Sequence, residues 1–249
     1  MSKNISVKFN VQLQESKFIE RTNRFILKCE INSKSLDNGM DHNIVEAHLG
    51  DTGRLKEILI PGCKVWLKPA DNPNRKTKWT AVLCKTSDNG SLISLVSTLP
   101  TKLINKALRE NALEEFEGWK FLKSEYKMGN SRFDFLLENN QGKKMLLEVK
   151  SVTHIVKDGL GLFPDAVTAR GARHVRELRE IAKENEDIET AILFVAQRED
   201  VEVIKANRDI DPNFADEIEK AKKDGVKIFG RKCHIDLEKI VLGDRVVVK

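Results

Sequence analysis

Two apolar runs near the middle of the chain, residues 132–137 and 144–152, are separated by a short polar turn. This pattern predicts two antiparallel strands of a hairpin. Three charges interrupt the runs: Asp134 in the first, and Glu148 and Lys150 in the second. Side chains on a strand alternate between its two faces, so Glu148 and Lys150 point the same way. We therefore expect the hairpin to bring two carboxylates and an ammonium group together.

Such a cluster suits Mg2+ or Mn2+ and a phosphodiester, because hard cations prefer oxygen ligands. We expect Asp134 and Glu148 to hold the metal together with the backbone carbonyl of Val149. Lys150 would then orient the attacking water or help to deprotonate it. The alternative is a salt bridge from Lys150 to Asp134 or Glu148 on an exposed face of the sheet. The pattern of charges alone leaves both interpretations open.

The first hundred residues consist of short alternating segments, separated by turn residues such as Asp37-Asn38-Gly39 and Pro61-Gly62. This pattern predicts an all-β module. About five strands in this length fit a small barrel such as the oligonucleotide-binding (OB) fold, and a sandwich is the alternative. The expected strands are residues 5–13, 25–31, 44–48, 64–67, 80–85 and 92–96.

Leu99-Pro100-Thr101 marks a seam, after which strand patterns alternate with helical ones. The alternation predicts an α/β domain with a mixed sheet over residues 99–249, following a domain over residues 1–98. Thr101 is expected to cap a helix that runs to Ala112. The other expected helices are residues 167–185 and 213–223, and the expected strands are residues 120–126, 132–137, 144–152, 190–196, 226–229 and 245–248.

The helix expected from Val167 carries a basic flank beside its apolar stripe. On this flank, Arg170, Arg173 and His174 border the sheet. We expect them to contact phosphates or to stabilise the charge of a transition state. Asp165, just before the helix, would cap its N-terminus or serve as a further metal ligand.

Glutamates near these cations have more than one available role. We expect Arg176 and Arg179, further along the same helix, to pair with Glu177 and Glu180 rather than to bind phosphate. The helix that precedes the strands offers Glu110, Glu114 and Glu115, and of these we expect Glu114 to reach the metal cluster and join the catalytic group. The alternative for Glu114 is simple solvation, as for most helical glutamates.

Positive charge is concentrated in the first hundred residues, which hold 15 Lys and Arg against 10 Asp and Glu. The remaining residues hold 28 of each, so the first module carries the whole net charge of +5. A basic module next to a neutral one predicts contact with a nucleic-acid backbone, and ordinary solubility charge is the alternative. Trp79 would stack on bases, or else pack against its own strand. The expected contacts are Arg54, Lys56, Arg75, Lys76, Lys78 and Trp79.

The composition is that of a folded protein, with 40% hydrophobic and 33% charged residues. No apolar run approaches the roughly 18 residues of a membrane-spanning helix, and the N-terminus does not resemble a signal peptide. The cysteines form no Cys-x-x-Cys pair, which argues against a zinc site and for reduced thiols that fill the core. We therefore expect a cytoplasmic protein without membrane association. The cysteines are Cys29, Cys63, Cys84 and Cys233.

Several segments closely resemble the sugar fermentation stimulation protein (SfsA) family: Glu148 to Thr153, Phe163 to Leu178, Thr52-Gly53-Arg54 and Asp71-Asn72. The resemblance spans nearly the whole chain, and its Phe-Pro-Asp-Ala block is specific. It implies an N-terminal OB-like barrel joined to a C-terminal nuclease-like domain of the PD-(D/E)XK type. It also implies DNA binding with little sequence preference and a regulatory role in sugar metabolism.

The nuclease-like triad of the family falls on Asp134, Glu148 and Lys150, the same charges that the hydrophobic pattern singled out. The chain departs from the usual family form at Gly50-Asp51, where Pro-Asn is expected, and at Ala169, where Glu is frequent. These differences put the detail of one barrel loop and a charge at position 169 in doubt, and they leave the triad intact.

We therefore expect a DNA-binding protein that carries the site of a Mg2+-dependent endonuclease. The alternative is a non-enzymatic DNA-binding regulator of sugar metabolism in which the nuclease domain is a relic. An OB-like barrel accepts single strands of DNA or RNA, so double-stranded DNA, single-stranded DNA and RNA are all candidate partners. The sequence leaves the oligomeric state open.

Overall fold

The computed structural model describes residues 4–31, 43–51, 53–72, 74–87 and 89–249. The turn expected at Asp37-Asn38-Gly39 lies outside these residues, as does Thr52 of the family motif. The chain divides into two compact units, here called the α/β unit and the barrel unit. The α/β unit contains the N-terminal segment through Val7 with residues 98–234 and 241–249, and the barrel unit contains residues 8–97 and 235–240.

The barrel unit is built on a closed β-barrel. Its strands hydrogen-bond in the order β4-β3-β2-β5-β6-β7, and a parallel pairing of β4 with β6, with Ala47 opposite Trp79, closes the ring. This is the OB-like barrel that the sequence predicts. Buried apolar side chains such as Leu27, Leu67 and Ala81 fill its interior. The strands are β2 (Gln14–Asn23), β3 (Ile26–Ile31), β4 (Asn43–Leu49), β5 (Lys64–Pro69), β6 (Trp79–Lys85) and β7 (Leu92–Ser94).

The start of the barrel differs from the prediction. The sequence predicts a strand over residues 5–13, but β1 (Ser6–Lys8) pairs with β16 in the sheet of the α/β unit. The first barrel strand is β2, which the sequence pattern does not predict. Within this fully described strand only Ser16 and Phe18 are buried, and the Ser16 hydroxyl donates to the carbonyl of Val65 at 2.7 Å. A strand with so few inward apolar residues carries almost no alternation signal.

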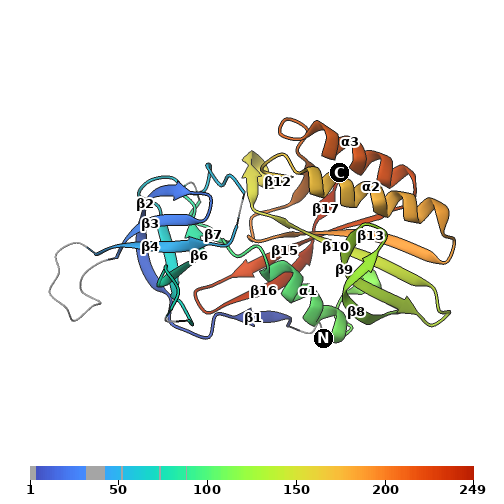
Figure 1. Cartoon of the computed structure of the whole chain (residues 1–249), viewed down its shortest axis with the longest axis horizontal. Helices are drawn as coiled ribbons and strands as arrows, with labels where there is room; N and C mark the ends of the chain where they lie inside the picture. The colour runs from blue at the N-terminus through green and yellow to red at the C-terminus, as the bar shows by residue number, and fades with distance from the viewer. Residues whose placement is uncertain (1–3, 32–42, 52, 73, 88) are drawn as a thin grey trace. The chain divides into compact units, whose positions relative to one another are not determined.

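The α/β unit contains a mixed sheet, as the sequence predicts. Its main sheet has the strand order β1-β16-β15-β13-β10-β9-β8 (Figure 1). The β10–β13 and β13–β15 pairs are parallel, whereas the β8–β9 and β9–β10 pairs are antiparallel. There is also a small second sheet, β11-β12-β14-β17, of which the sequence pattern predicts only β17, within the strand expected over residues 245–248. The strands are β8 (Trp119–Met128), β9 (Ser131–Asn139), β10 (Lys144–Val152), β11 (His154–Val156), β12 (Leu160–Phe163), β13 (Ile188–Ala196), β14 (Val203–Ala206), β15 (Lys227–Ile235), β16 (Lys239–Arg245) and β17 (Val247–Val248).

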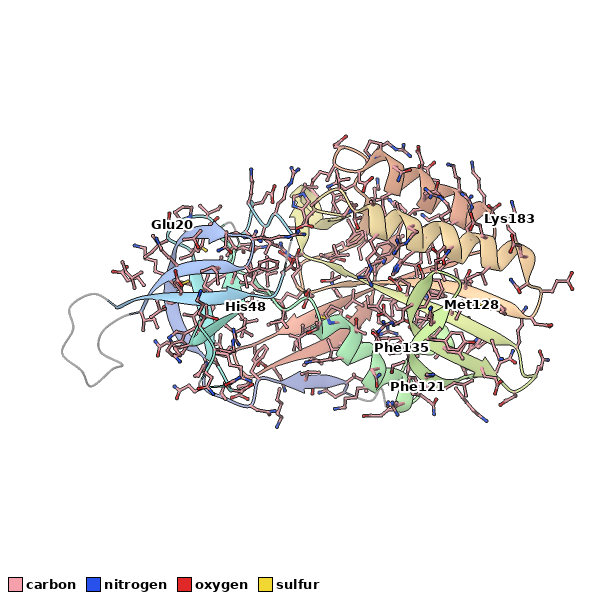
Figure 2. All side chains as sticks on the ribbon, viewed as in Figure 1. Glu20, His48, Phe121, Met128, Phe135 and Lys183 are labelled. Carbon is pink, nitrogen blue, oxygen red and sulfur yellow. The ribbon has the colours of Figure 1, made fainter. Side chains whose placement is uncertain are left out.

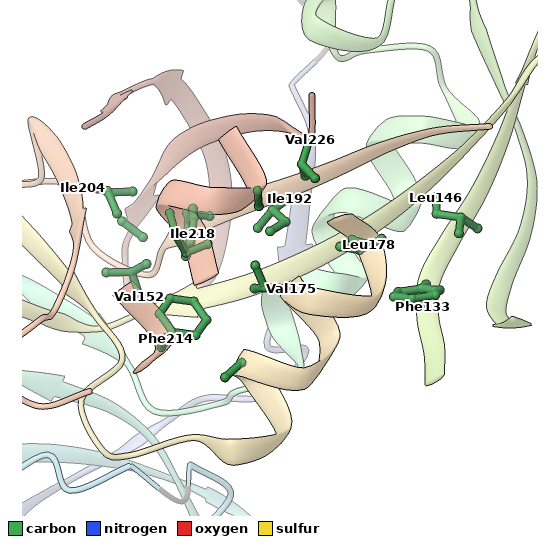
Figure 3. Close-up of a cluster of buried hydrophobic side chains, with 14 of the residues drawn as sticks. Phe133, Leu146, Val152, Val175, Leu178, Ile192, Ile204, Phe214, Ile218 and Val226 are labelled. Atoms are coloured by element: carbon green, nitrogen blue, oxygen red, sulfur yellow. The ribbon is translucent and has the colours of Figure 1, made fainter. Parts of the chain in front are cut away.

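Helices pack against this sheet. The helical segments are α1 (Leu99–Arg109), η2 (Glu114–Phe116), η3 (Lys157–Gly159), α2 (Ala169–Glu184) and α3 (Pro212–Lys223). α2 and α3 cover one face over a cluster of buried side chains that includes Phe133, Leu146 and Phe214 (Figure 3). α1 packs against β8 and β10, and near it the rings of Phe121 and Phe135 meet edge to face with centroids 6.2 Å apart (Figure 2). Among the described residues, no helix combines the length and hydropathy needed to cross a bilayer.

The helix starts also differ from the prediction. The N-cap of α1 is Thr98 rather than Thr101. The cap of α2 is Thr168 and not Asp165, because the Thr168 hydroxyl accepts a hydrogen bond from a backbone N–H of the first helical turn at 3.0 Å. The backbone N–H of Thr168 donates to Asp211 at 2.8 Å, and Asp211 in turn caps α3. The starts of the two helices are thus tied together.

Two cysteines that are distant in sequence meet in the barrel unit. The Sγ atoms of Cys63 and Cys84 lie 3.5 Å apart, and the two residues carry thiols rather than a disulfide. The hydrogen bond from Cys84 lowers the pKa of the Cys63 thiol, although burial opposes this effect. In contrast, burial raises the pKa of Cys233 to about 12. The sequence predicts that the cysteines only fill the core, but the lowered pKa favours the reactive thiolate form of Cys63.

Candidate active site and nucleic-acid interface

Asp134 lies at the point where β9 and β10 separate. The ladder between these strands ends with Phe135 opposite Leu147. Beyond this pair, Asp134 Oδ2 accepts a hydrogen bond from the backbone N–H of Val149 at 2.7 Å. A side-chain carboxylate thus satisfies a strand N–H that has passed the end of the ladder. This arrangement holds Asp134 beside the strand that carries Glu148.

Glu148 is buried, and two donors hold one of its oxygens. Oε1 lies 2.6 Å from Lys150 Nζ and 2.7 Å from His174 Nδ1. The other oxygen, Oε2, is inaccessible to water and has no hydrogen-bond partner among the described residues. Glu148 and Lys150 are only 5% and 9% exposed, so their ion pair is not on the exposed sheet face that the salt-bridge alternative requires. An unpartnered buried oxygen is costly, and a cation would satisfy it.

Asp134 and Glu148 differ in their tendency to ionise. Burial, aided by the charge of Glu148, raises the pKa of Asp134 from 3.8 to about 7. Burial also acts to raise the pKa of Glu148, but the charge of Lys150 and the hydrogen bond from His174 outweigh it, and the pKa falls below its usual value. The pair therefore combines an ionised Glu148 with an Asp134 that titrates near neutral pH. A bound divalent cation would favour the charged form of both.

Asp134 also lines a pocket of about 470 Å3 to which α1 and the strands β8 and β9 contribute. From α1 come Lys102, Lys106 and Arg109, spaced so that they share one face of the helix. Glu110 lines the same pocket. The sequence interpretation missed these cations, although their spacing in an amphipathic helix is a signal that could have found them. The pocket thus places positive charge near a carboxylate of the triad.

The structure corrects the prediction for Glu114. Helix α1 ends at Arg109, and Glu114 lies in the separate 3-10 turn η2. Its Oε1 is 3.7 Å from Arg231 and 3.7 Å from Arg245, and with these arginines it lines a different pocket. Of the three glutamates considered, Glu110 shares the pocket with Asp134, and Glu125 of β8 lines it as well.

The basic flank of α2 is only partly available to phosphate. His174 is 3% exposed and contacts Glu148, so the predicted phosphate contact for His174 is wrong. Arg170 is exposed, and its Nε lies 3.4 Å from His174 Nε2. Arg173 is exposed and lies 3.8 Å from Glu177. Arg170 and Arg173 therefore remain the predicted phosphate contacts on this helix.

The later arginines of α2 pair across to α3. Arg176 and Arg179 lie 3.7 Å and 2.9 Å from Glu217. Among the described ion pairs, their partner is therefore the buried Glu217 of α3 and not, as predicted from the sequence, Glu180 or Glu177 of their own helix. Sequence spacing reports neighbours on one helix and not those on the next.

The donors at the triad fit a hard divalent cation. Carboxylate oxygens of Asp134 and Glu148 and the carbonyl of Val149 are of the kind that Mg2+, Mn2+ and Ca2+ prefer. Among the described residues no group of three or more His, Cys, Asp or Glu side chains is close enough to hold a metal. A cation here would rest on two carboxylates and take further oxygens from backbone, water or phosphate. Asp165 Oδ2 is also buried without a hydrogen-bond partner among the described residues, and its role as a ligand stays a prediction.

Arg54 and Lys56 lie beside a pocket of about 430 Å3 in the barrel unit, together with Arg21 and Arg24. Arg21 donates to two backbone carbonyls of the loop at 2.7 Å and 2.8 Å, which fixes its position. Arg24 lies 6.0 Å from the ring of Phe25, which is 48% exposed in the turn between β2 and β3. In OB folds the loop between the first two strands binds oligonucleotides, so these two residues extend the predicted interface.

Arg75, Lys76 and Lys78 lie in the loop between β5 and β6, the fourth and fifth strands of the barrel. This loop is the second one that OB folds use for oligonucleotides. Lys76 and Lys78 are exposed, and Arg75 donates to two threonine hydroxyls at 3.1 Å and 3.0 Å. Trp79 is half-buried and packs against the barrel core, as the packing alternative requires.

The fold and these clusters define a two-domain protein with an OB barrel and an α/β domain that carries an Asp, Glu and Lys triad. Residues 19–95 match the family model described as the SfsA N-terminal OB domain, and residues 98–239 match the sugar fermentation stimulation protein RE domain. The chain belongs to the sugar fermentation stimulation protein family. The predicted architecture, an OB barrel followed by an α/β domain with a mixed sheet, is confirmed.

Relatives match over nearly the full chain. The sugar fermentation stimulation protein homolog of Shouchella clausii is 42% identical over 236 residues, which cover 95% of this chain and 97% of the relative. That of Moorella thermoacetica is 40% identical over 244 residues, 98% of this chain and 99% of the relative. The solved structure of Pyrococcus furiosus SfsA in complex with Ca2+ superposes with a TM-score of 0.83 at 26% identity and covers 99% of both chains.

Proposed function

We propose that this protein binds DNA with little sequence preference and hydrolyses phosphodiester bonds at a divalent-metal site formed by Asp134 and Glu148. The observation that carries the proposal is Glu148 Oε2, a buried carboxylate oxygen without a hydrogen-bond partner among the described residues. The high pKa of Asp134 points the same way, because a neighbouring cation would relieve the crowding of negative charge. The structural relative from Pyrococcus furiosus was solved with Ca2+, a cation of the same class.

Each residue of the site has a defined task in this proposal. Asp134, Glu148 and the Val149 carbonyl would hold Mg2+ or Mn2+, which supplies a Lewis acid for the phosphodiester and a more acidic bound water. Lys150 holds Glu148 Oε1 and would orient the attacking water. The cations of α1 would bind phosphates of the strand at the pocket that Asp134 lines. The helix thus supplies charge and the strands supply the metal ligands.

The barrel unit would grip the sugar-phosphate backbone. Its pocket with Arg24, Arg54 and Lys56 supplies cations, and the exposed ring of Phe25 supplies a surface on which a base can stack. Backbone contacts carry no sequence information, which agrees with binding of little sequence preference. The loop with Lys76 and Lys78 would extend the same kind of contact.

The test is incubation of supercoiled plasmid with purified protein and Mg2+ or Mn2+, beside Asp134→Asn and Glu148→Gln. These variants keep the shape of the side chains and remove the charge. Glu114→Gln is the matched control, because Glu114 pairs with Arg231 at another pocket. We expect nicking by the wild type and the control, and loss of about 100-fold or more in the two site variants. Equal nicking by all four proteins would reject the catalytic claim.

A non-enzymatic DNA-binding protein is the second candidate, and a specific observation favours it. Glu148 and Lys150 are almost fully buried and neutralise each other at 2.6 Å, as a purely structural ion pair would. This candidate predicts that DNA binding needs no metal and survives both site substitutions. It also predicts no metal-dependent nicking by any of the proteins. Electrophoretic mobility shifts with and without EDTA, beside the plasmid assay, separate the two candidates.

A further inference from the structure

A chain of polar contacts runs from the exposed flank of α2 to the buried carboxylate of the triad. Arg170 Nε lies 3.4 Å from His174 Nε2, and His174 Nδ1 lies 2.7 Å from Glu148 Oε1. The same Oε1 accepts from Lys150 Nζ at 2.6 Å. These contacts leave Oε2 as the oxygen of Glu148 that has no donor among the described residues.

The directions of these hydrogen bonds follow from what each group can do. A guanidinium can only donate, so His174 Nε2 must accept from Arg170 and carries no proton. The ring proton therefore sits on Nδ1 and is donated to Glu148 Oε1. Since a carboxylate oxygen accepts, Lys150 and His174 both donate to it. Arg170 thus selects the tautomer of His174, and His174 fixes the rotation of the Glu148 carboxylate.

The surroundings of His174 restrict its ring. It is 3% exposed, and it meets the ring of Phe133 nearly edge to face with centroids 6.0 Å apart. Gly171, one turn earlier in α2, permits the tight start of the helix, because a Cβ there would meet the Thr168 side chain at 2.8 Å. The imidazole is therefore placed by packing and by its two polar partners. A residue held in this way is a device for positioning its neighbour.

We propose that His174 is a positioning residue for the metal ligand Glu148, and that Arg170 sets the tautomer on which this depends. The inference rests on the proposed metal site and deepens it. In the wild type, Oε1 is occupied by His174 and Lys150, so Oε2 alone is presented to a cation. Arg170 is exposed at the start of α2, so a phosphate can reach it. A phosphate bound to Arg170 would affect Glu148 through His174, which contacts both residues.

Two substitutions of His174 separate positioning from packing. His174→Asn places an amide N–H near the position of Nδ1, whereas His174→Gln places one near Nε2. Both leave a similar gap beside Phe133, so a purely structural role predicts equal losses of stability and of metal binding. A positioning role predicts that Asn retains metal affinity that Gln loses. Lys183→Ala is the control, since Lys183 is exposed on the same helix and lies near Asp224.

The experiment measures Mn2+ affinity by electron paramagnetic resonance for the full-length wild type, both His174 variants, Arg170→Ala and Lys183→Ala. We expect His174→Gln to weaken Mn2+ binding by about 10- to 100-fold and His174→Asn by clearly less. Arg170→Ala should weaken it by a few fold, and Lys183→Ala should not change it. Thermal melts of every variant report whether each one is folded.

A second measurement needs no metal. Nitrogen NMR of the imidazole in metal-free protein, assigned with His174→Asn, should show a proton on Nδ1 and none on Nε2. Arg170→Ala should allow the other tautomer to appear. If the wild type binds Mn2+ and all variants bind it equally, the positioning role is wrong while the metal site stands. If the wild type binds no Mn2+, the proposed function and the inference fall together.

Discussion

The carboxylate of Asp134 accepts a hydrogen bond from the backbone N–H of Val149 at 2.7 Å, just past the last paired residues of β9 and β10. The contact explains why an aspartate stands in an apolar strand: it satisfies a backbone donor that has no strand partner on that side. It also places the carboxylate in a buried environment beside Glu148, which raises the pKa of Asp134 to about 7. The same side chain thus completes the backbone hydrogen bonding of the strand and has a pKa near neutral pH.

The first prediction concerns stability and pH. The pKa of Asp134 is raised in the folded protein, so the protonated form contributes stability below pH 4 that is lost as pH rises through 7. The Asp134→Asn variant keeps a side-chain oxygen that accepts from the backbone N–H of Val149. It cannot ionise, so its stability should not show this decline as pH rises. Urea unfolding in EDTA measures the free energy of unfolding of the variant and of the wild type. The difference between them should shift in favour of the variant by on the order of 3 kcal/mol from pH 4 to pH 8. A gain that is the same at both pH values would contradict the assignment.

The same comparison with Ca2+ serves as its control. A cation that binds at Asp134 and Glu148 stabilises the folded wild type and not the variant. Millimolar Ca2+ should therefore shrink the advantage of Asp134→Asn at pH 8.

The second prediction concerns the buried ion pair of Lys150 and Glu148. Removing one partner leaves an uncompensated charge, so Lys150→Met should lower the free energy of unfolding by about 3 kcal/mol. The double variant Glu148→Gln with Lys150→Met should lose less free energy of unfolding than the sum of the two single variants. The reason is that both charges are removed together, so no unpaired charge stays buried. Urea unfolding of the double-mutant cycle measures the coupling. Strict additivity would mean that the 2.6 Å contact contributes nothing to stability.

The third prediction concerns the barrel. Arg54→Ala and Lys56→Ala should each weaken DNA binding and reduce the slope of log affinity against log salt by about 0.9 for duplex DNA, since each removes one phosphate contact. Fluorescence anisotropy with labelled DNA at several salt concentrations measures the slope. Lys64→Ala is the control, because Lys64 pairs with Glu15 at 2.8 Å. Slopes that are equal for all four proteins would place the DNA contact elsewhere.

The fourth prediction concerns thiol reactivity. The pKa of Cys63 is lowered by its hydrogen bond with Cys84, and Cys63 is half-buried, whereas the other cysteines are buried. Because thiolates react with alkylating agents, Cys63 should be modified first at neutral pH. Mass spectrometry should detect one rapid adduct per folded chain with iodoacetamide, and Cys63→Ser should abolish it. Rapid labelling that persists in this variant would assign the reactive thiol to another position.

The elements that the sequence predicts best have strong hydrophobic periods. The strand over residues 144–152 has the bounds of β10, because buried apolar residues flank its charges. In contrast, β2 was missed, since only Ser16 and Phe18 of that described strand face inward. The hydrophobic periodicity of a segment predicts its secondary structure only where apolar residues mark the buried face. It therefore fails for strands that are mostly polar.

The triad could be predicted because its members lie on one hairpin, and its partners could not. His174 contacts Glu148 across 26 positions of sequence, and of the three candidate glutamates it is Glu110, not Glu114, that shares a pocket with Asp134. Tertiary packing determines both of these placements, and residue spacing within one helix or strand cannot predict them. The long-range contacts of Arg176 and Arg179 with Glu217 were missed for the same reason.

The pairing of β1 with β16 sets a limit on how the protein can be dissected. A fragment that starts at residue 98 would lack the opening strand and would leave the border of β16 without its neighbour, a surface that invites self-association. A nascent chain likewise cannot complete this sheet until β16 (Lys239–Arg245) has been made. Laboratory fragments meant to isolate the triad should therefore keep the first residues, fused through a designed linker if the barrel is to be removed.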